Sequence, residues 1–380
     1  MTESAAAAMA TRFIDRPEAL RDAVERWLEV PELAFDTEFV RERTYYARLG
    51  LIQIFDGREV ALIDPVALPD LSPLSAVLTH PGVLKIAHSA SEDLSILRLR
   101  LGVLPRPLFD TQLAASLVGM SPPPGYQRLI TETLGVTLAK EETRTDWVRR
   151  PLSAGQLAYA GEDVEHLLPA FHKLRERLHE LGRWDWAVED SESMLVEAAT
   201  DEAEDEVFLR FRSASRLKPA QQQALRDLAA WREREAKRRD LPRRFVINDD
   251  LLFDLATKPP ATEQDLRSLK GYDARQVERQ VPEILRLVIE THAEAKRSAR
   301  AVLVPADLRP DEKRRLETLR EVVQKEAERL AIRPDVLANR RPLERLIRGQ
   351  ARTTAQAFQG WRAEVLSPLL DPVLSPAKGL

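Results

Sequence analysis

The stretch Leu33-Ala-Phe-Asp-Thr-Glu-Phe-Val40 is the most informative segment of the chain, because two carboxylates interrupt an otherwise apolar run. A short run flanked by aromatic and β-branched residues favours a buried β-strand. Side chains alternate along a strand, so Asp36 and Glu38 share one face with Cα atoms about 6.5–7 Å apart. Acidic side chains among apolar residues rarely repay their desolvation without a cation, so the pair indicates a metal site. A half-exposed strand with a polar face is the alternative.

Further strands are expected on the C-terminal side of this stretch. Residues 49–55, Leu-Gly-Leu-Ile-Gln-Ile-Phe, have the apolar character of a hairpin partner, and residues 59–63 form a third apolar run. Beyond them, short apolar runs alternate with helical patterns. This order predicts an α/β domain.

A third acidic residue, Asp93, follows an apolar run that begins at Val83. Ser89 or Ser91 is a natural helix N-cap, which places Asp93 in the first helical turn. Taken alone, such a residue is more often a partner of the helix dipole than a metal ligand. His88 is either a substrate contact or a polar residue at the end of a strand.

The segment from Gln156 to Leu168 has a helical pattern despite Gly161. Tyr159 and Asp163 are four residues apart and therefore lie on one helix face, about 6 Å apart along the axis. A phenol beside a metal-bound water can orient that water for attack. A core tyrosine next to a surface aspartate is the competing interpretation.

Together these segments resemble the DEDD superfamily of 3′ to 5′ exonucleases, in its tyrosine-bearing subclass. The histidine-bearing subclass would carry His where this chain has Ala158. Within the superfamily the sequence is most similar to the ribonuclease D family. The segments that carry the similarity are 36–46, 49–53, 88–94, 109–115 and 146–152.

The resemblance implies a ribonuclease H-like α/β exonuclease domain with two divalent metal ions, Mg²⁺ or Mn²⁺. Asp36, Glu38 and Asp163 would hold one ion, and Asp36 with Asp93 would hold or position the second. Glu38 would also contact the 3′-terminal sugar, and Tyr159 would aim the attacking water.

Bulk composition excludes several classes of protein. The chain has 380 residues, enough for two or three domains, with 44% hydrophobic and 31% charged residues. It has no cysteine, which excludes disulfides and thiolate zinc sites. No apolar stretch approaches 18 residues, so we expect a cytoplasmic protein without a membrane segment.

The net charge of −4 hides a strong segregation of charge. Asp185 to Glu206 holds ten acidic residues and no basic one, whereas Trp231 to Phe245 holds seven basic and three acidic residues. Residues 225–236 and 241–252 resemble the HRDC domain, a small helical module that commonly binds nucleic acid. A solvated helix is the alternative interpretation of the basic run.

The C-terminal half contains an internal repeat at an offset of 91 residues. The offset superposes Leu217-Lys-Pro219 on Leu308-Arg-Pro310 and Asn248 on Asn339. We therefore expect two helical modules after the exonuclease domain. The predicted divisions are a disordered leader 1–10, an exonuclease domain 11–190, an acidic linker 191–207, an HRDC domain 208–293 and a second HRDC-like domain 294–380.

The predicted function is that of a metal-dependent 3′ to 5′ exoribonuclease, a monomer without an obligate protein partner, which releases 5′-mononucleotides from RNA with a free 3′ end. The family resemblance implies 3′ maturation of tRNA precursors. The alternatives are a 3′ to 5′ DNA exonuclease in repair and a catalytically silent RNA-binding protein. The candidate substrate contacts are Glu38, Arg41, Tyr45, His88, Arg243, Arg244, Arg340 and Arg341.

Overall fold

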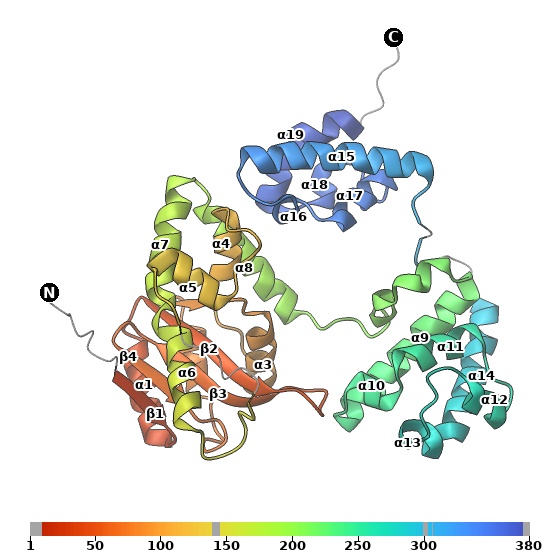
Figure 1. The fold of residues 1–380 in the computed structure, drawn as a ribbon, viewed down its shortest axis with the longest axis horizontal. Coiled ribbons are helices and arrows are strands. Elements are labelled where there is room, and N and C mark those ends of the chain that lie inside the picture. The colour runs from red at the N-terminus through yellow and green to blue at the C-terminus, as the bar shows by residue number, and fades with distance from the viewer. Residues whose placement is uncertain (1–9, 139–144, 299–302, 306, 375–380) are drawn as a thin grey trace, which may run out of the picture. The chain divides into compact units, whose positions relative to one another are not determined.

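A computed structural model describes residues 10–138, 145–298, 303–305 and 307–374 of the chain (Figure 1). Contacts divide the chain into two compact units. The first contains the described residues up to Val40, Arg48–Thr200 and those from Pro310 onward; the second contains Arg41–Ala47 and Asp201–Arg309. The predicted leader lies outside the described residues, except for Ala10, which begins the first strand.

A six-stranded mixed sheet forms the centre of the first unit, in the order β1-β4-β3-β2-β5-β6. β2 pairs with β3 antiparallel and with β5 parallel, so it is a central strand. The strands are β1 Ala10–Ile14, β2 Glu32–Val40, β3 Arg48–Phe55, β4 Glu59–Ile63, β5 Leu84–Ala87 and β6 Leu108–Asp110.

Helices cover this sheet on both faces. The bounds are α1 Pro17–Trp27, α2 Leu74–Leu78, α3 Ser91–Leu101, α4 Thr111–Leu117, α5 Tyr126–Leu134, α6 Ala154–Glu165, α7 Leu167–Glu180 and α8 Trp184–Ala199. One hydrophobic core joins Ile52 and Ile54 of β3 to Leu20 of α1 and Leu94 of α3. The other face is covered by α6, which contacts β2, β3 and β4 (Figure 1).

The predicted fold class, an α/β exonuclease-type sheet followed by helices, is confirmed. The strands expected at 33–40, 49–55 and 59–63 match β2, β3 and β4 to within one residue. The helix expected over 156–168 is two helices, because α6 ends at Glu165 and α7 begins at Leu167. Ser153 and Gln156 form a capping box that fixes the start of α6.

The second unit is helical around one hydrophobic core that includes Leu225, Leu252 and Ile284. Its elements are η1 Val207–Arg210, η2 Arg212–Arg216, α9 Pro219–Arg239, α10 Arg243–Val246, α11 Asp249–Thr257, α12 Glu263–Ser268, α13 Ala274–Val277, η3 Glu278–Gln280 and α14 Val281–Ser298. None of the helices in the described part of the chain has the length and apolar character that crossing a membrane requires.

The helices after Pro310 repeat the order of those in the second unit. They are α15 Pro310–Arg329, α16 Pro334–Leu337, α17 Arg340–Ile347, α18 Thr354–Ala357 and α19 Gly360–Leu374. α15, α16 and α17 each begin 91 residues after α9, α10 and α11. The helix starts therefore follow the offset of the internal sequence repeat.

The repeated segment contacts the sheet domain through α8. Trp361 stacks on Trp186 with ring centroids 4.3 Å apart, and its indole N–H donates to Asp190 at 2.9 Å. The Arg362 guanidinium also binds Asp190, which is 7% exposed. Part of the acidic stretch is thus packed, and α8 runs on through the predicted boundary at residue 190 to Ala199.

Candidate active site

The acidic pair lies where β2 departs from regular pairing. Asp36 is opposite Gln53 of β3, and Glu38 is opposite Leu51. The register shifts directly after Glu38 because Phe39 pairs with Leu49, which leaves Gly50 as the extra residue. Bulges of this kind bend a strand and redirect its side chains, and they recur beside active sites.

Gly50 also allows the loop before α6 to lie against β3. A Cβ atom on Gly50 would lie 2.7 Å from the Cβ of Trp147, too close for any other residue. The Arg150 guanidinium donates to the Gly50 carbonyl at 2.7 Å and to Asp64 at 2.8 Å. These contacts fix the start of α6, and hence Asp163, relative to β2.

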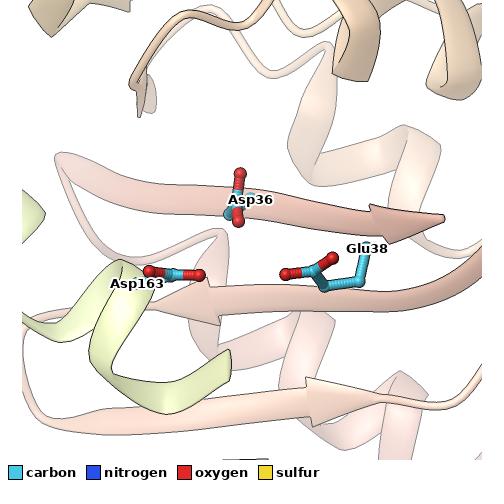
Figure 2. A group of neighbouring side chains, drawn as sticks. All are labelled: Asp36, Glu38 and Asp163. Carbon is cyan, nitrogen blue, oxygen red and sulfur yellow. The ribbon is translucent and has the colours of Figure 1, made fainter. Parts of the chain in front are cut away.

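Asp36, Glu38 and Asp163 form one acidic cluster. One carboxylate oxygen from each lies within 4.8 Å of the others. Figure 2 shows Asp163, carried by α6, beside the two acids of the sheet. Carboxylate oxygens are the ligands that hard divalent cations prefer, so the donor set fits Mg²⁺ or Mn²⁺.

The pKa values in the cluster show the effect of burying several carboxylates close together. Desolvation, followed by the neighbouring carboxylates Asp93, Asp163 and Glu38, raises the pKa of Asp36 well above its ordinary value. Desolvation, with Asp163 and Asp93, raises the pKa of Glu38 to about 8. A bound cation would favour the ionised carboxylates and reverse these shifts.

Asp93 lies in the first turn of α3, as predicted, and next to this cluster but outside the group of three. The predicted serine N-cap is wrong, because Ala90 is the N-cap residue and no side chain caps the helix. Thr37, between the two strand acids, donates its hydroxyl to Asp93. Burial raises the pKa of Asp93 to about 6.

Tyr159 lies one helical turn before Asp163 on α6. Desolvation, the charge of Asp163 and a hydrogen bond to that carboxylate raise the pKa of Tyr159, so its hydroxyl stays protonated near neutral pH. Both residues line a cavity of about 260 Å³ that also contains Tyr126. Tyr126 donates to the backbone carbonyl of Glu162 at 2.7 Å, so it both braces α6 and faces the cavity.

The other predicted substrate contacts lie elsewhere. His88 Nδ1 lies 2.9 Å from Thr111 Oγ1, and its Nε2 lies 3.2 Å from the Pro124 carbonyl oxygen. Burial lowers the pKa of His88 to about 4, so the ring is neutral. Both ring nitrogens are engaged within the protein, which favours the structural interpretation of this residue.

Four of the predicted contacts line one cavity of about 490 Å³ in the second unit: Arg41, Tyr45, Arg243 and Arg244. Arg243 lies over the Tyr45 ring, 5.3 Å from its centroid, and donates to Glu233 at 2.8 Å. In the repeated segment, Arg340 is paired with Glu344 at 2.6 Å. Arg341 is exposed beside it at the start of α17.

Sequence reasoning missed the residues that hold the acids in place. Arg150 and Trp147 fall in a segment noted for family resemblance, but no role had been assigned to them. Their roles depend on contacts between β3, α6 and the preceding loop. Spacing along the chain does not contain that information.

Comparison with known proteins identifies the class of this site. A family model described as a 3′–5′ exonuclease matches residues 11–179, and one described as an HRDC domain matches residues 221–288. Together with the acidic cluster on β2 and α6, the first of these matches defines the sheet domain as a 3′–5′ exonuclease.

Full-length relatives identify the family. The chain is 35% identical to ribonuclease D of Pseudomonas paraeruginosa, over 94% of this chain and 96% of that one. It is 33% identical to ribonuclease D of Escherichia coli, over 96% and 98%. The crystal structure of Escherichia coli RNase D superposes with a TM-score of 0.88 at 32% identity, covering 96% and 99% of the two chains. The chain belongs to the ribonuclease D family and is a 3′–5′ exoribonuclease.

The raised pKa values predict that the metal-free protein loses stability as the pH rises. Glu38 binds its proton more tightly in the folded chain, where its pKa is about 8, than in the unfolded chain, where it is near 4.5. Its stabilising contribution is therefore fully present below about pH 4.5 and is lost as the pH rises through about 8. Thermal unfolding in EDTA from pH 5 to 8.5 should show a falling Tm.

The Glu38→Gln variant, which cannot ionise at this position, is the control and should show a shallower decline. Adding Mg²⁺ or Mn²⁺ should also flatten the wild-type curve, because a cation stabilises the ionised cluster. A wild-type Tm that is constant or rises over this window, or a variant with the same slope, would contradict the assigned electrostatics.

Proposed function

We propose that Asp36, Glu38, Asp93 and Asp163 hold two divalent metal ions, Mg²⁺ or Mn²⁺, during exonucleolytic hydrolysis. The observation that carries this proposal is the oxygen-only cluster of Asp36, Glu38 and Asp163, whose ligand atoms lie within 4.8 Å of one another. Asp93 adjoins the cluster through Thr37 and contributes to the raised pKa of Asp36. In this proposal Asp93 completes the second ion's site with Asp36.

When bound, such ions activate a water for attack and offset charge on the leaving oxygen. The water oxygen attacks the phosphorus of the terminal nucleotide, and the bond from phosphorus to the 3′ oxygen of the preceding nucleotide breaks. The water gives up a proton, and the leaving oxygen gains one. The products are a nucleoside 5′-monophosphate and an RNA with a new 3′ hydroxyl.

Tyr159 orients the attacking water in this proposal. Its phenol is protonated near neutral pH, so it can donate a hydrogen bond but is a poor base. Asp163 accepts from this hydroxyl, which fixes the ring and leaves the phenol oxygen to accept a hydrogen bond from the attacking water. Glu38, which lies on β2 beside the β3 bulge, is proposed to contact the terminal sugar as well, which requires a free 3′ end.

The proposed substrates are structured RNAs with a free 3′ end, among them precursors of tRNA that carry 3′ extensions. The Escherichia coli relative is described as an exoribonuclease involved in structured RNA processing, and it matches this chain over nearly its full length. The proposed working form is a monomer, since one chain supplies the whole acidic cluster. The lack of cysteine agrees with a cytoplasmic location.

The arginine-lined cavity of the second unit is the proposed binding site for the RNA backbone. Five arginines line it, Arg41, Arg210, Arg232, Arg243 and Arg244, against the two acids Glu42 and Asp249. Guanidinium groups bind phosphates in bidentate geometry, and aromatic rings stack on bases. Tyr45 and Phe211 supply such rings in the same cavity. Arg340 and Arg341 are proposed as weaker contacts.

The catalytic proposal predicts strict dependence on the metal, on Asp163 and on the 3′ end. RNA with a free 3′ hydroxyl should yield 5′-mononucleotides in Mg²⁺ or Mn²⁺ and remain intact in EDTA. Asp163→Asn should reduce the rate at least about 100-fold with the fold retained, since a ligand and the partner of Tyr159 are lost. Chromatography of the products and circular dichroism provide the measurements.

Matched substrates supply the controls. A 3′-blocked RNA should be resistant, and a DNA of the same sequence should be degraded more slowly. Digestion of the blocked RNA would rule out an exonuclease that requires the 3′ end, and equal digestion of DNA would remove the preference for RNA. Wild-type turnover by Asp163→Asn would exclude that residue from the site.

If this cavity binds the RNA backbone, Arg244→Ala should weaken RNA binding without changing the chemical step. A lost phosphate contact should weaken binding similarly across sequences and lower the slope of log K against log salt by about 1. Arg297→Ala is the matched control, because Arg297 is exposed, paired with Glu294 and outside this cavity. Equal RNA binding and equal salt slopes for both variants would refute the RNA-binding role of this cavity.

A further inference from the structure

Gln53 is a polar side chain in an unusual environment. It lies in the middle of β3, between Asp36 of β2 and Leu62 of β4, and its side chain is fully buried. Neither its amide nitrogen nor its amide oxygen has a hydrogen-bond partner among the residues that the structure describes. A buried polar group without a partner destabilises the folded chain. An apolar residue at this position would avoid that cost.

The strand register places this amide against the acidic cluster. Residues directly opposite in an antiparallel pair point to the same face of the sheet, with Cβ atoms about 4.5–5.5 Å apart. Gln53 therefore shares the face of Asp36, whereas its neighbours Ile52 and Ile54 belong to the hydrophobic core on the other face. A glutamine side chain can span that separation.

Helix α6 limits the partners available to Gln53 on this face. α6 contacts β2, β3 and β4, and its residues Ala160 and Val164 are fully buried. Their side chains offer no hydrogen-bonding group. On the face of the sheet that α6 covers, the Asp36 carboxylate is the hydrogen-bond acceptor directly opposite Gln53.

We propose that Gln53 is a positioning residue for the metal site, whose amide N–H donates to the Asp36 carboxylate when that carboxylate holds a metal ion. The amide must present nitrogen and not oxygen, because a carbonyl oxygen would repel the carboxylate. A donor on one carboxylate oxygen leaves the other free as a ligand and fixes its direction. Carboxylates that bind metals are commonly held by hydrogen bonds of this kind. This inference rests on the proposed metal site.

A second buried glutamine provides the contrast. Gln222 in α9 is 1% exposed, but its amide nitrogen donates to the carbonyls of Ala214 and Val304, and its amide oxygen accepts from the backbone of Leu303. Gln222 is therefore satisfied within the folded chain and has a structural role. Gln53 has the same burial without those bonds.

The test compares Gln53→Met with Gln222→Met in the full-length chain. Both replace an amide by an apolar side chain of similar length. Calorimetric titration with Mn²⁺ alone should show about 10–100-fold weaker binding for Gln53→Met, the range typical for loss of such a supporting hydrogen bond. Its Tm in EDTA should be equal to or higher than that of the wild type, because the variant has no unpaired buried amide. Gln222→Met should have a lower Tm and wild-type affinity for Mn²⁺.

Activity gives an independent readout. For Gln53→Met, the Mn²⁺ concentration for half-maximal activity should rise by the same factor, while the KM for RNA stays constant. Wild-type Mn²⁺ affinity in Gln53→Met would overturn the inference about Gln53. Absence of Mn²⁺ binding by the wild type would instead overturn the metal site itself. If Gln53→Met does not fold, Gln53→Asn, which keeps an amide but is shorter, should show the same loss of affinity, and wild-type affinity would refute the role.

Discussion

Mutual repulsion among desolvated carboxylates is the constraint on which the first unit depends. Asp36, Glu38 and Asp163 lie within 4.8 Å of one another, and their surroundings raise the pKa of Asp36 and Glu38. Such an arrangement opposes folding unless the scaffold imposes it. The β3 bulge at Gly50 and the contacts of Arg150 hold the strand and helix that carry the acids. A bound cation would relieve this repulsion, and that relief would contribute to the affinity of the site for the cation.

The parts of the site that follow local patterns could be predicted from the sequence. Alternation along 33–40 placed Asp36 and Glu38 on one face, and the four-residue spacing placed Tyr159 with Asp163. Contacts between distant segments could not be predicted in this way. The unpaired amide of Gln53 depends on the register of β2 with β3, and the His88 contacts depend on the loop at Pro124. A sequence pattern indicates the periodicity of a helix or strand but not which other elements pack against it.

The internal repeat shows how one helical module can take two roles. The helix starts of α15 to α17 keep the offset of 91 residues from α9 to α11, so the frame is the same. In the second unit, the module contributes Arg243 and Arg244 to a cavity with Tyr45. In the segment after Pro310, Trp361 and Arg362 instead bind Asp190 of α8.

Anomalous diffraction from crystals of the full-length protein grown with Mn²⁺ tests the central claim most directly, because it locates the ions without relying on activity. We predict manganese peaks at the cluster, one coordinated by Asp36, Glu38 and Asp163 and a second beside Asp36 and Asp93. No peak at these carboxylates under saturating Mn²⁺, or peaks only at other residues, would contradict it.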